Sequence, residues 1–207
     1  MPVADRYLDL LARALTRELF LEKEVRNVDL REWPLGEPEV LRSLQRERGW
    51  RLVRPGAIRD VRAVGHDWPP QAETMVGLAR LANVRSCVTT ALADGVPGDL
   101  VETGVWRGGT SIFVRATLEA LGDEERRVWA CDSFEGLPEA DAERIPMDVE
   151  MRFHEFPQLA VGLDAVKANF ARYDVLDDRA VTDHRAAHGI VDEIHPVDWT
   201  AVWWRKS

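Results

Sequence analysis

Apolar residues recur at helical spacing through the first half of the chain. Four leucines three or four positions apart predict an amphipathic helix over residues 4–22: Leu8, Leu11, Leu15 and Leu19. Residues 23–37 are charged and read as irregular. A second helix is expected to begin at Pro38, to turn Leu41 and Leu44 inward, and to stop at Gly49.

Residues 50–70 contain Pro55, Gly65, Pro69 and Pro70, which indicates a loop. A long helix follows, because apolar side chains share one face: Met75, Leu78, Leu81, Val84, Val88 and Leu92. It should end at Gly95, and Pro97 prevents its continuation.

The pattern then changes to strand, glycine turn and helix. Leu100 and Val101 form a short apolar run that meets Glu102, and glycines follow at 104, 108 and 109. A helix over 110–121 should bury Ile112, Phe113 and Ala116 and end at Gly122. Residues 127–132 predict a second strand that closes on an acidic residue.

The last third of the chain begins with a predicted loop over residues 133–158. A helix is predicted by Leu163, Val166, Phe170 and Tyr173. Residues 180–188 predict a short helix stopped by Gly189, and residues 198–205 a final strand. Three strands are fewer than a doubly wound sheet usually has, so the pattern predicts an α/β fold whose central strands are missing.

Composition narrows the class of protein. The chain has 207 residues and a net charge of −9, which argues against binding to nucleic acid or to an anionic membrane surface. No signal peptide or bilayer-spanning run is evident, and Cys87 and Cys131 suit a reduced compartment. We therefore expect a cytoplasmic protein with two parts, an N-terminal helical extension or lid (1–95) and a Rossmann-like domain (96–207).

The glycine turn is the strongest functional signal. A strand, a tight turn and a helix N-terminus form the place where parallel α/β sheets hold nucleotide-like ligands. The spacing Gly-x-x-x-Gly-Gly differs from the dinucleotide pattern and suits an adenosine ligand without a pyrophosphate. Asp132 could accept both ribose hydroxyls, or it could be a solvated strand-end or capping residue. Glu102 favours a cationic ligand, such as a sulfonium compound with an α-amino group; its alternative is a surface charge.

Other residues near this turn carry two interpretations each. The hydroxyls of Thr110 and Ser133 could contact the ligand or cap local structure, and for Thr110 the helix N-cap is favoured. Thr74 could be an N-cap, or could form a lid edge with Met75. Trp106, inside the turn with Arg107, must either cover the ligand or anchor the turn to the N-terminal helices.

Two further pairs resemble metal sites only superficially. His184 and His188 are four apart on the predicted helix but lack the glutamate of the metalloprotease pattern, so surface histidines are expected. Asp177 and Asp178 lie in a charged turn without a supporting ligand, so a solvated turn is expected. No metal ligand and no catalytic residue is therefore predicted.

The motifs together resemble the macrocin O-methyltransferase (TylF) family of sugar methyltransferases. The resemblance rests on VPGDLVETGVWRGGT (96–110), ETMVGLARL (73–81), DSFEGLP (132–138), VKANFARY (166–173) and the tail over 188–205. It implies a class I methyltransferase fold that uses S-adenosylmethionine and magnesium to methylate a deoxysugar hydroxyl on a macrolide-like natural product.

The resemblance also implies roles for individual residues. The residues expected to hold the methionine part of the cofactor are Glu102, Thr103, Gly104, Gly108, Gly109, Thr110 and Ser111. Asp132, with Ser133 beside it, would hold the ribose, and Thr74 and Met75 would close over the cofactor.

The chain departs from the family after residue 179. A middle block that carries the family's magnesium-binding aspartates is expected to be missing between Arg179 and Ala180, and Asp177–Asp178 matches a turn instead. Two hypotheses follow. The first is an O-methyltransferase that acts on a glycosylated small molecule and could form a homo-oligomer. The second is an inactive, internally deleted remnant that at most binds cofactor or associates with a partner. A hydride-transferring enzyme is disfavoured by the glycine spacing.

Overall fold

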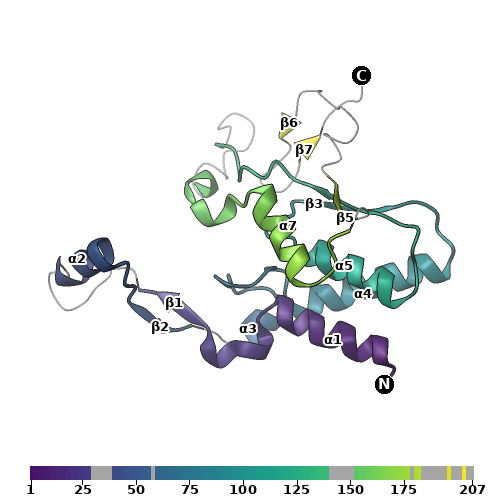
Figure 1. The fold of residues 1–207 in the computed structure, drawn as a ribbon, viewed down its shortest axis with the longest axis horizontal. Helices are drawn as coiled ribbons and strands as arrows, with labels where there is room; N and C mark the ends of the chain where they lie inside the picture. Colours follow the sequence, from purple (N-terminus) through teal and green to yellow (C-terminus); the bar gives the residue numbers. More distant parts are fainter. Residues whose placement is uncertain are drawn as a thin grey trace.

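The computed structural model describes residues 1–28, 39–56, 59–139 and 152–177, and the strand segments 180–182, 195–196 and 202–203. The N-terminal part is mostly helical, and the part after residue 99 supplies a parallel sheet (Figure 1). The predicted division into residues 1–95 and 96–207 stays a prediction, although helices from both parts share one apolar core.

The first helix is shorter than predicted. Helix α1 spans Val3–Leu15, and a 3-10 helix, η1 (Glu18–Lys23), follows a turn at which Arg17 has φ of 59°. The Thr16 hydroxyl donates to the Ala12 carbonyl oxygen, so this residue competes with the continuation of the helix. The leucine stripe itself is confirmed, since Leu8, Leu11 and Leu15 are buried.

Two stretches predicted as irregular contain short elements. Strand β1 (Val25–Asn27) pairs antiparallel with β2 (Val53–Pro55), and helix α3 (Arg59–Ala63) follows. Three-residue strands leave little trace in the sequence, because their pairing partner lies far along the chain.

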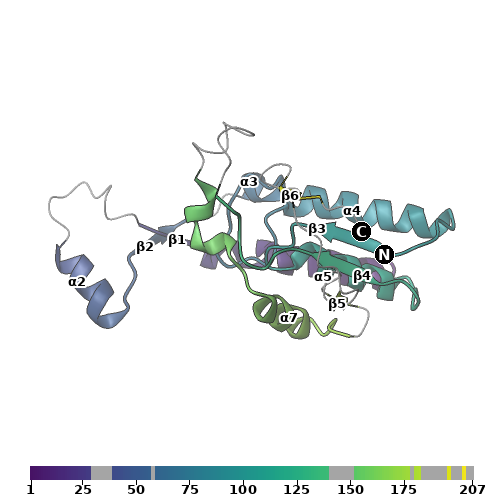
Figure 2. The ribbon, with the colours of Figure 1, turned by 90° about the horizontal axis from the view of Figure 1, so that it is seen from above.

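Helix α2 (Glu39–Arg48) stands at the end of this hairpin, away from the other helices (Figures 1 and 2). The prediction that Leu41 and Leu44 face a core is wrong, because no residue of α2 is buried. Gly49 has φ of 65° and its N–H donates to the Gln45 carbonyl oxygen, which confirms the predicted helix end. Pro38 lies outside the described residues.

Helix α4 spans Gly77–Ala93 and ends as predicted. Gly95 has φ of 64°, and its N–H donates to the Leu92 carbonyl oxygen. Leu81 and Val88 are buried, whereas Leu78, Val84 and Leu92 are partly buried against the core.

The central sheet is parallel, with strand order β3-β4-β5. Strand β3 (Leu100–Thr103) pairs with β4 (Val128–Cys131) along its whole length, and β4 pairs with β5 (Ala180–Thr182). The predicted helix over 180–188 is therefore wrong in its first three residues. The strand-favouring pair Val181 and Thr182 follows the pairing with β4 instead.

The C-terminal strand prediction is only partly matched. Val202–Trp203 form β7, which pairs antiparallel with β6 (His195–Pro196). In the described part of the chain this pair is separate from the parallel sheet. The remainder of 183–207 lies outside the described residues.

One face of the sheet is covered by helices. Helix α5 (Gly109–Ala120) is buried along most of its length between α1, α4 and the sheet, and α7 (Leu163–Arg172) adds Val166 and Phe170 to the same core. In Figure 1 the sheet lies above α5, α4 and α1. On the other face Val101 is 63% exposed, so the described elements build a one-sided sheet.

Candidate functional site at the glycine turn

The turn between β3 and α5 forms as the glycines predict. Gly104 and Gly108 have φ of 80° and 86°, and Trp106 between them has φ of 50°. Helix α5 begins at Gly109, with Gly108 as its N-cap residue and no capping side chain. The N-cap interpretation of Thr110 is therefore wrong, because Thr110 already lies inside the helix.

Asp132 lies against this turn and closes it. Its Oδ2 accepts hydrogen bonds from the N–H groups of Val105 (2.7 Å) and Trp106 (3.3 Å), and its Oδ1 accepts one from Phe134 (2.9 Å). Because β3 and β4 are parallel, their carboxyl ends meet at one edge, and Asp132 bridges them. The alternative of a solvated strand-end residue is wrong. The capping alternative holds in that the carboxylate caps backbone N–H groups, but these belong to turns and not to a helix.

Glu102 is not the surface charge that the alternative interpretation described. Its carboxylate accepts a hydrogen bond from the Ser111 hydroxyl at the start of α5. Burial raises the pKa of Glu102 to about 7, although hydrogen bonds from Ser111 and Thr110 act in the opposite direction, and the negative charge of Asp132 adds to the increase. The site thus holds a carboxyl group that a nearby positive charge would return to its ionised form.

We expect this carboxyl group to make stability pH-dependent. Its folded-state pKa exceeds the unfolded value, so the folded protein binds more protons between about pH 4.5 and 7, and stability falls as pH rises through that window. Glu102→Gln should flatten this dependence by about 1 to 3 kcal/mol. Urea unfolding at pH 5 and pH 8 measures it; an unchanged difference between the two pH values would contradict the assignment.

The segment before α4 packs on the turn. The Glu73 carbonyl oxygen accepts a hydrogen bond from the Gly109 N–H (3.0 Å), and the hydroxyls of Thr74 and Thr110 lie 3.4 Å apart. Thr74 is buried, whereas Met75 is half-buried. The N-cap interpretation of Thr74 is wrong, because Val76 is the N-cap residue of α4 and Gly77 the first helical one.

Thr103 and Ser133 are the outlying members of the predicted set. Thr103 is exposed at the end of β3. The Ser133 hydroxyl donates to the Gly136 carbonyl oxygen (3.2 Å) and accepts from the Glu135 N–H (3.3 Å). Ser133 therefore stabilises a local turn, as its alternative interpretation described.

Trp106 and Arg107 fasten the turn on two sides. The Trp106 indole N–H donates to the Gln158 carbonyl oxygen (2.9 Å). The Arg107 guanidinium lies 4.2 Å from the Trp106 ring centroid and donates to the carbonyl oxygens of Pro70 (2.9 Å) and Ala72 (2.8 Å). Trp106 therefore anchors the turn to the segment around Gln158 and not to the N-terminal helices, and Arg107 supplies the link to the segment before α4.

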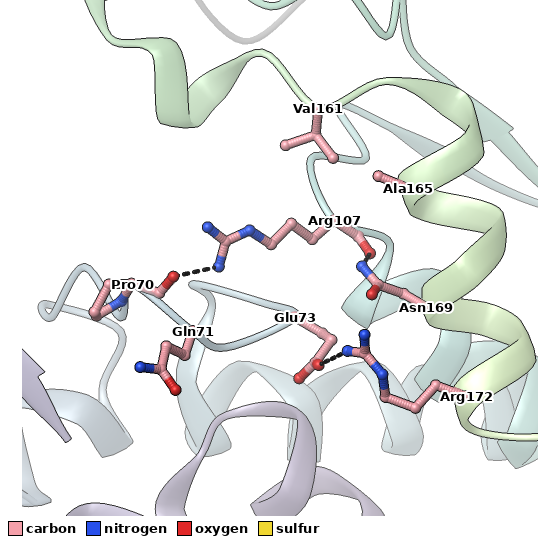
Figure 3. Close-up of a pocket in the computed structure, with 8 residues that line it drawn as sticks. All are labelled: Pro70, Gln71, Glu73, Arg107, Val161, Ala165, Asn169 and Arg172. Carbon is pink, nitrogen blue, oxygen red and sulfur yellow. Dashed lines mark hydrogen bonds and ion pairs between the residues drawn. The ribbon is translucent and has the colours of Figure 1, made fainter. Parts of the chain in front are cut away.

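A cavity of about 300 Å³ lies beside Arg107 (Figure 3). Its lining comes from the segment before α4, the turn and α7: Pro70, Gln71, Glu73, Arg107, Val161, Ala165, Asn169 and Arg172. Asn169 donates to the Arg107 carbonyl oxygen (2.9 Å), and Arg172 donates to Glu73 (3.0 Å). Sequence analysis missed Gln71, Glu73, Asn169 and Arg172, because nothing in their spacing shows that these segments meet.

Of the four residues in the two candidate metal pairs, only Asp177 lies in the described part of the chain. Asp177 forms an ion pair with Arg115 (2.5 Å), while Asp178, His184 and His188 lie outside the described residues. Within the described ranges no three His, Cys, Asp or Glu side chains gather as a metal site would require. None of the described helices has both the length and the apolar character to cross a bilayer.

The fold has a solved counterpart. The structure of the O-methyltransferase NovP matches with a TM-score of 0.64 and 25% identity, over 99% of each chain. This likeness defines the class, an α/β protein with the parallel sheet of an O-methyltransferase.

The family follows from the sequence match. The model of the family Macrocin-O-methyltransferase (TylF) matches residues 4–181, so the chain belongs to that family. The match runs past the junction at Arg179 and Ala180 and ends within β5. A deletion at that junction therefore stays a prediction.

Two curated methyltransferases are similar in sequence to the chain. The chain is 49% identical over 176 residues to the 8-demethyl-8-(2,3-dimethoxy-alpha-L-rhamnosyl)-tetracenomycin-C 4'-O-methyltransferase of Streptomyces olivaceus, covering 84% of this chain and 59% of the relative. It is 46% identical over 131 residues to the mycinamicin III 3''-O-methyltransferase of Micromonospora griseorubida, covering 62% and 52%. The chain thus spans little more than half the length of these relatives.

Proposed function

We propose that the chain is a class I methyltransferase that binds S-adenosylmethionine at the turn after β3 and methylates a sugar hydroxyl of a glycosylated natural product. The observation that carries the proposal is the half-buried Glu102 carboxyl group, which accepts from the Ser111 hydroxyl beside a turn closed by Asp132. A sulfonium ion and an α-ammonium group both supply the positive charge that would offset the desolvation of Glu102.

Different residues at the turn would hold different parts of the cofactor. Glu102 and Ser111 face the cationic methionine part. A carboxylate has about four acceptor positions, and three at Asp132 are used by backbone N–H groups, so we assign it one ribose hydroxyl rather than two. Thr74 and Met75, held to α5 through Glu73, form the edge that closes over the cofactor.

The acceptor is proposed to enter beside Arg107. Amide and guanidinium groups line the cavity there, and such groups hydrogen-bond sugar hydroxyls. S-adenosylmethionine supplies an electrophilic methyl group, and the protein's task is to hold the acceptor oxygen in line with it while excluding water. Magnesium stays an expectation from the family, and no described residue is assigned to it.

Two measurements test the proposal in sequence. Calorimetry with S-adenosylhomocysteine should show binding that Glu102→Gln and Asp132→Asn weaken by about tenfold or more. Absence of heat with the unmodified chain would reject the cofactor site. Methyl transfer from labelled S-adenosylmethionine to glycosylated acceptors, with and without magnesium, tests the activity. Binding without transfer would favour the second hypothesis, a remnant that binds cofactor only.

A further inference from the structure

Arg107 is a half-buried cation that pairs with no carboxylate among the described residues. Every other described arginine that is buried or half-buried forms an ion pair with an Asp or a Glu. Burial lowers the pKa of Arg107, and the negative charge of Glu73 offsets this effect only in part. Because a desolvated charge is normally compensated by an opposite one, the position beside Arg107 suits an anion from a ligand.

The Arg107 guanidinium group also has donors that the described part of the chain does not use. Only its Nη1 donates there, to the carbonyl oxygens of Pro70 and Ala72. A guanidinium group has five N–H bonds, so Nε and Nη2 carry the three others. The Trp106 ring covers one face of the group, which leaves the edge formed by Nε and Nη2. Such an edge matches the two oxygens of a carboxylate.

The cavity beside Arg107 has one positive charge in excess. Its two cations are Arg107 and Arg172, and its one carboxylate, Glu73, accepts a hydrogen bond from Arg172 at 3.0 Å. In Figure 3 the Arg107 side chain extends across the space between α7 and the segment before α4. The chain as a whole has a net charge of −9. A cleft of the opposite sign raises the local concentration of anionic ligands.

We propose that this cavity binds a negatively charged oxygen group of the acceptor, such as a carboxylate, with Arg107 as its counter-ion. The inference rests on the proposed function and adds to it a selection for acidic glycosides. The cavity volume of about 300 Å³ is at the lower end of the range for ligand pockets, so it encloses one part of the acceptor. Pro70, Val161 and Ala165 line the remainder and suit the carbon skeleton that carries the acid.

Two glycosides that differ by a single charge test the proposal on the full chain. Calorimetry in the presence of S-adenosylhomocysteine should show that para-carboxyphenyl rhamnoside binds about tenfold or more tightly than its methyl ester. Arg107→Gln should remove this preference and keep the affinity for the ester. Arg107→Lys should keep part of the preference, because lysine retains the charge without the planar fork. Arg80→Gln, on the exposed side of α4, is the control and should leave the preference unchanged.

A change of the opposite kind gives an independent readout. Glu73→Gln removes the one negative charge of the lining, so the preference for the acid over the ester should increase. Sodium acetate supplies the anion without the glycoside and should bind about tenfold or more weakly than the acid.

Four results would overturn the proposal. They are equal affinities for acid and ester, no binding of either at millimolar concentration, an Arg107→Gln variant that loses both affinities alike, and acetate binding as tight as that of the acid. The third result would mean that Arg107 only supports the shape of the cavity, and the fourth that the cavity takes free anions. Failure of the proposed function is distinguishable, since it would appear as absent binding of S-adenosylhomocysteine itself.

Discussion

Alanine at Gly109 should weaken binding of S-adenosylhomocysteine by about a hundredfold. A Cβ there would lie 2.5 Å from the Glu73 carbonyl oxygen and 2.7 Å from the Thr74 Cβ. The segment that closes over the turn would have to move outward, and overpacking of this kind costs about 1–3 kcal/mol. Calorimetry measures the affinity, and urea unfolding separates it from lost stability.

Gly162→Ala is the matched control for this substitution. A Cβ at Gly162 meets nothing within 4 Å, and its φ of −66° suits any residue. Affinity should stay close to that of the unmodified chain, and stability should fall by no more than about 1 kcal/mol, because Gly162 is the N-cap residue of α7. Equal losses in the two variants would mean that the contact between Glu73 and Gly109 is unimportant for binding.

Removing the Arg62 side chain should destabilise the protein by about 3–5 kcal/mol. Arg62 is 2% exposed, and its guanidinium donates to Asp67 (2.6 Å), to Glu24 (3.0 Å) and to the Thr16 carbonyl oxygen (3.0 Å). Arg62→Ala leaves the buried Glu24 carboxylate only the longer contacts with Arg17 (3.3 Å) and Arg26 (3.8 Å), and a poorly compensated buried charge is costly. Equilibrium unfolding in urea gives the free energy.

Arg59→Ala provides the comparison within the same helix. Arg59 pairs with Glu18, but its side chain is exposed, so the loss should stay below about 1 kcal/mol. A double variant, Arg62→Met with Glu24→Gln, should recover part of the stability because it removes both charges together. If Arg62→Ala proved as mild as Arg59→Ala, the buried ion pair would contribute little.

The sequence predicted the elements whose signals are local. Strands β3 and β4, helix α5 and the turn between them follow from an apolar run, glycines at 104, 108 and 109, and helical spacing that starts directly afterwards. The buried leucines of α1 and the end of α4 at Gly95 were also predicted from local signals. Each depends on residues within a few positions of one another.

The errors came from contacts between distant residues. Strand β5 forms because Ala180–Thr182 meet β4, and β1 and β2 exist only as a pair. The inward face of α2 was wrong because helical spacing of leucines does not show which element lies against them, and no residue of α2 is buried. The partial burial of Glu102 could not be predicted either, since it depends on how α5 packs over β3.

Asp132 and the segment around Glu73 also occupy the backbone hydrogen-bond donors of the turn. The N–H groups with partners inside the protein are those of Gly104, Val105, Trp106, Gly108 and Gly109. Phosphate-binding turns recognise their ligands through such N–H groups when these are free. In this turn those five N–H groups already have acceptors, and the Glu102 carboxyl group lies beside the start of α5. We therefore expect the turn to hold a pyrophosphate poorly, because the five N–H groups that could bind it already have acceptors inside the protein.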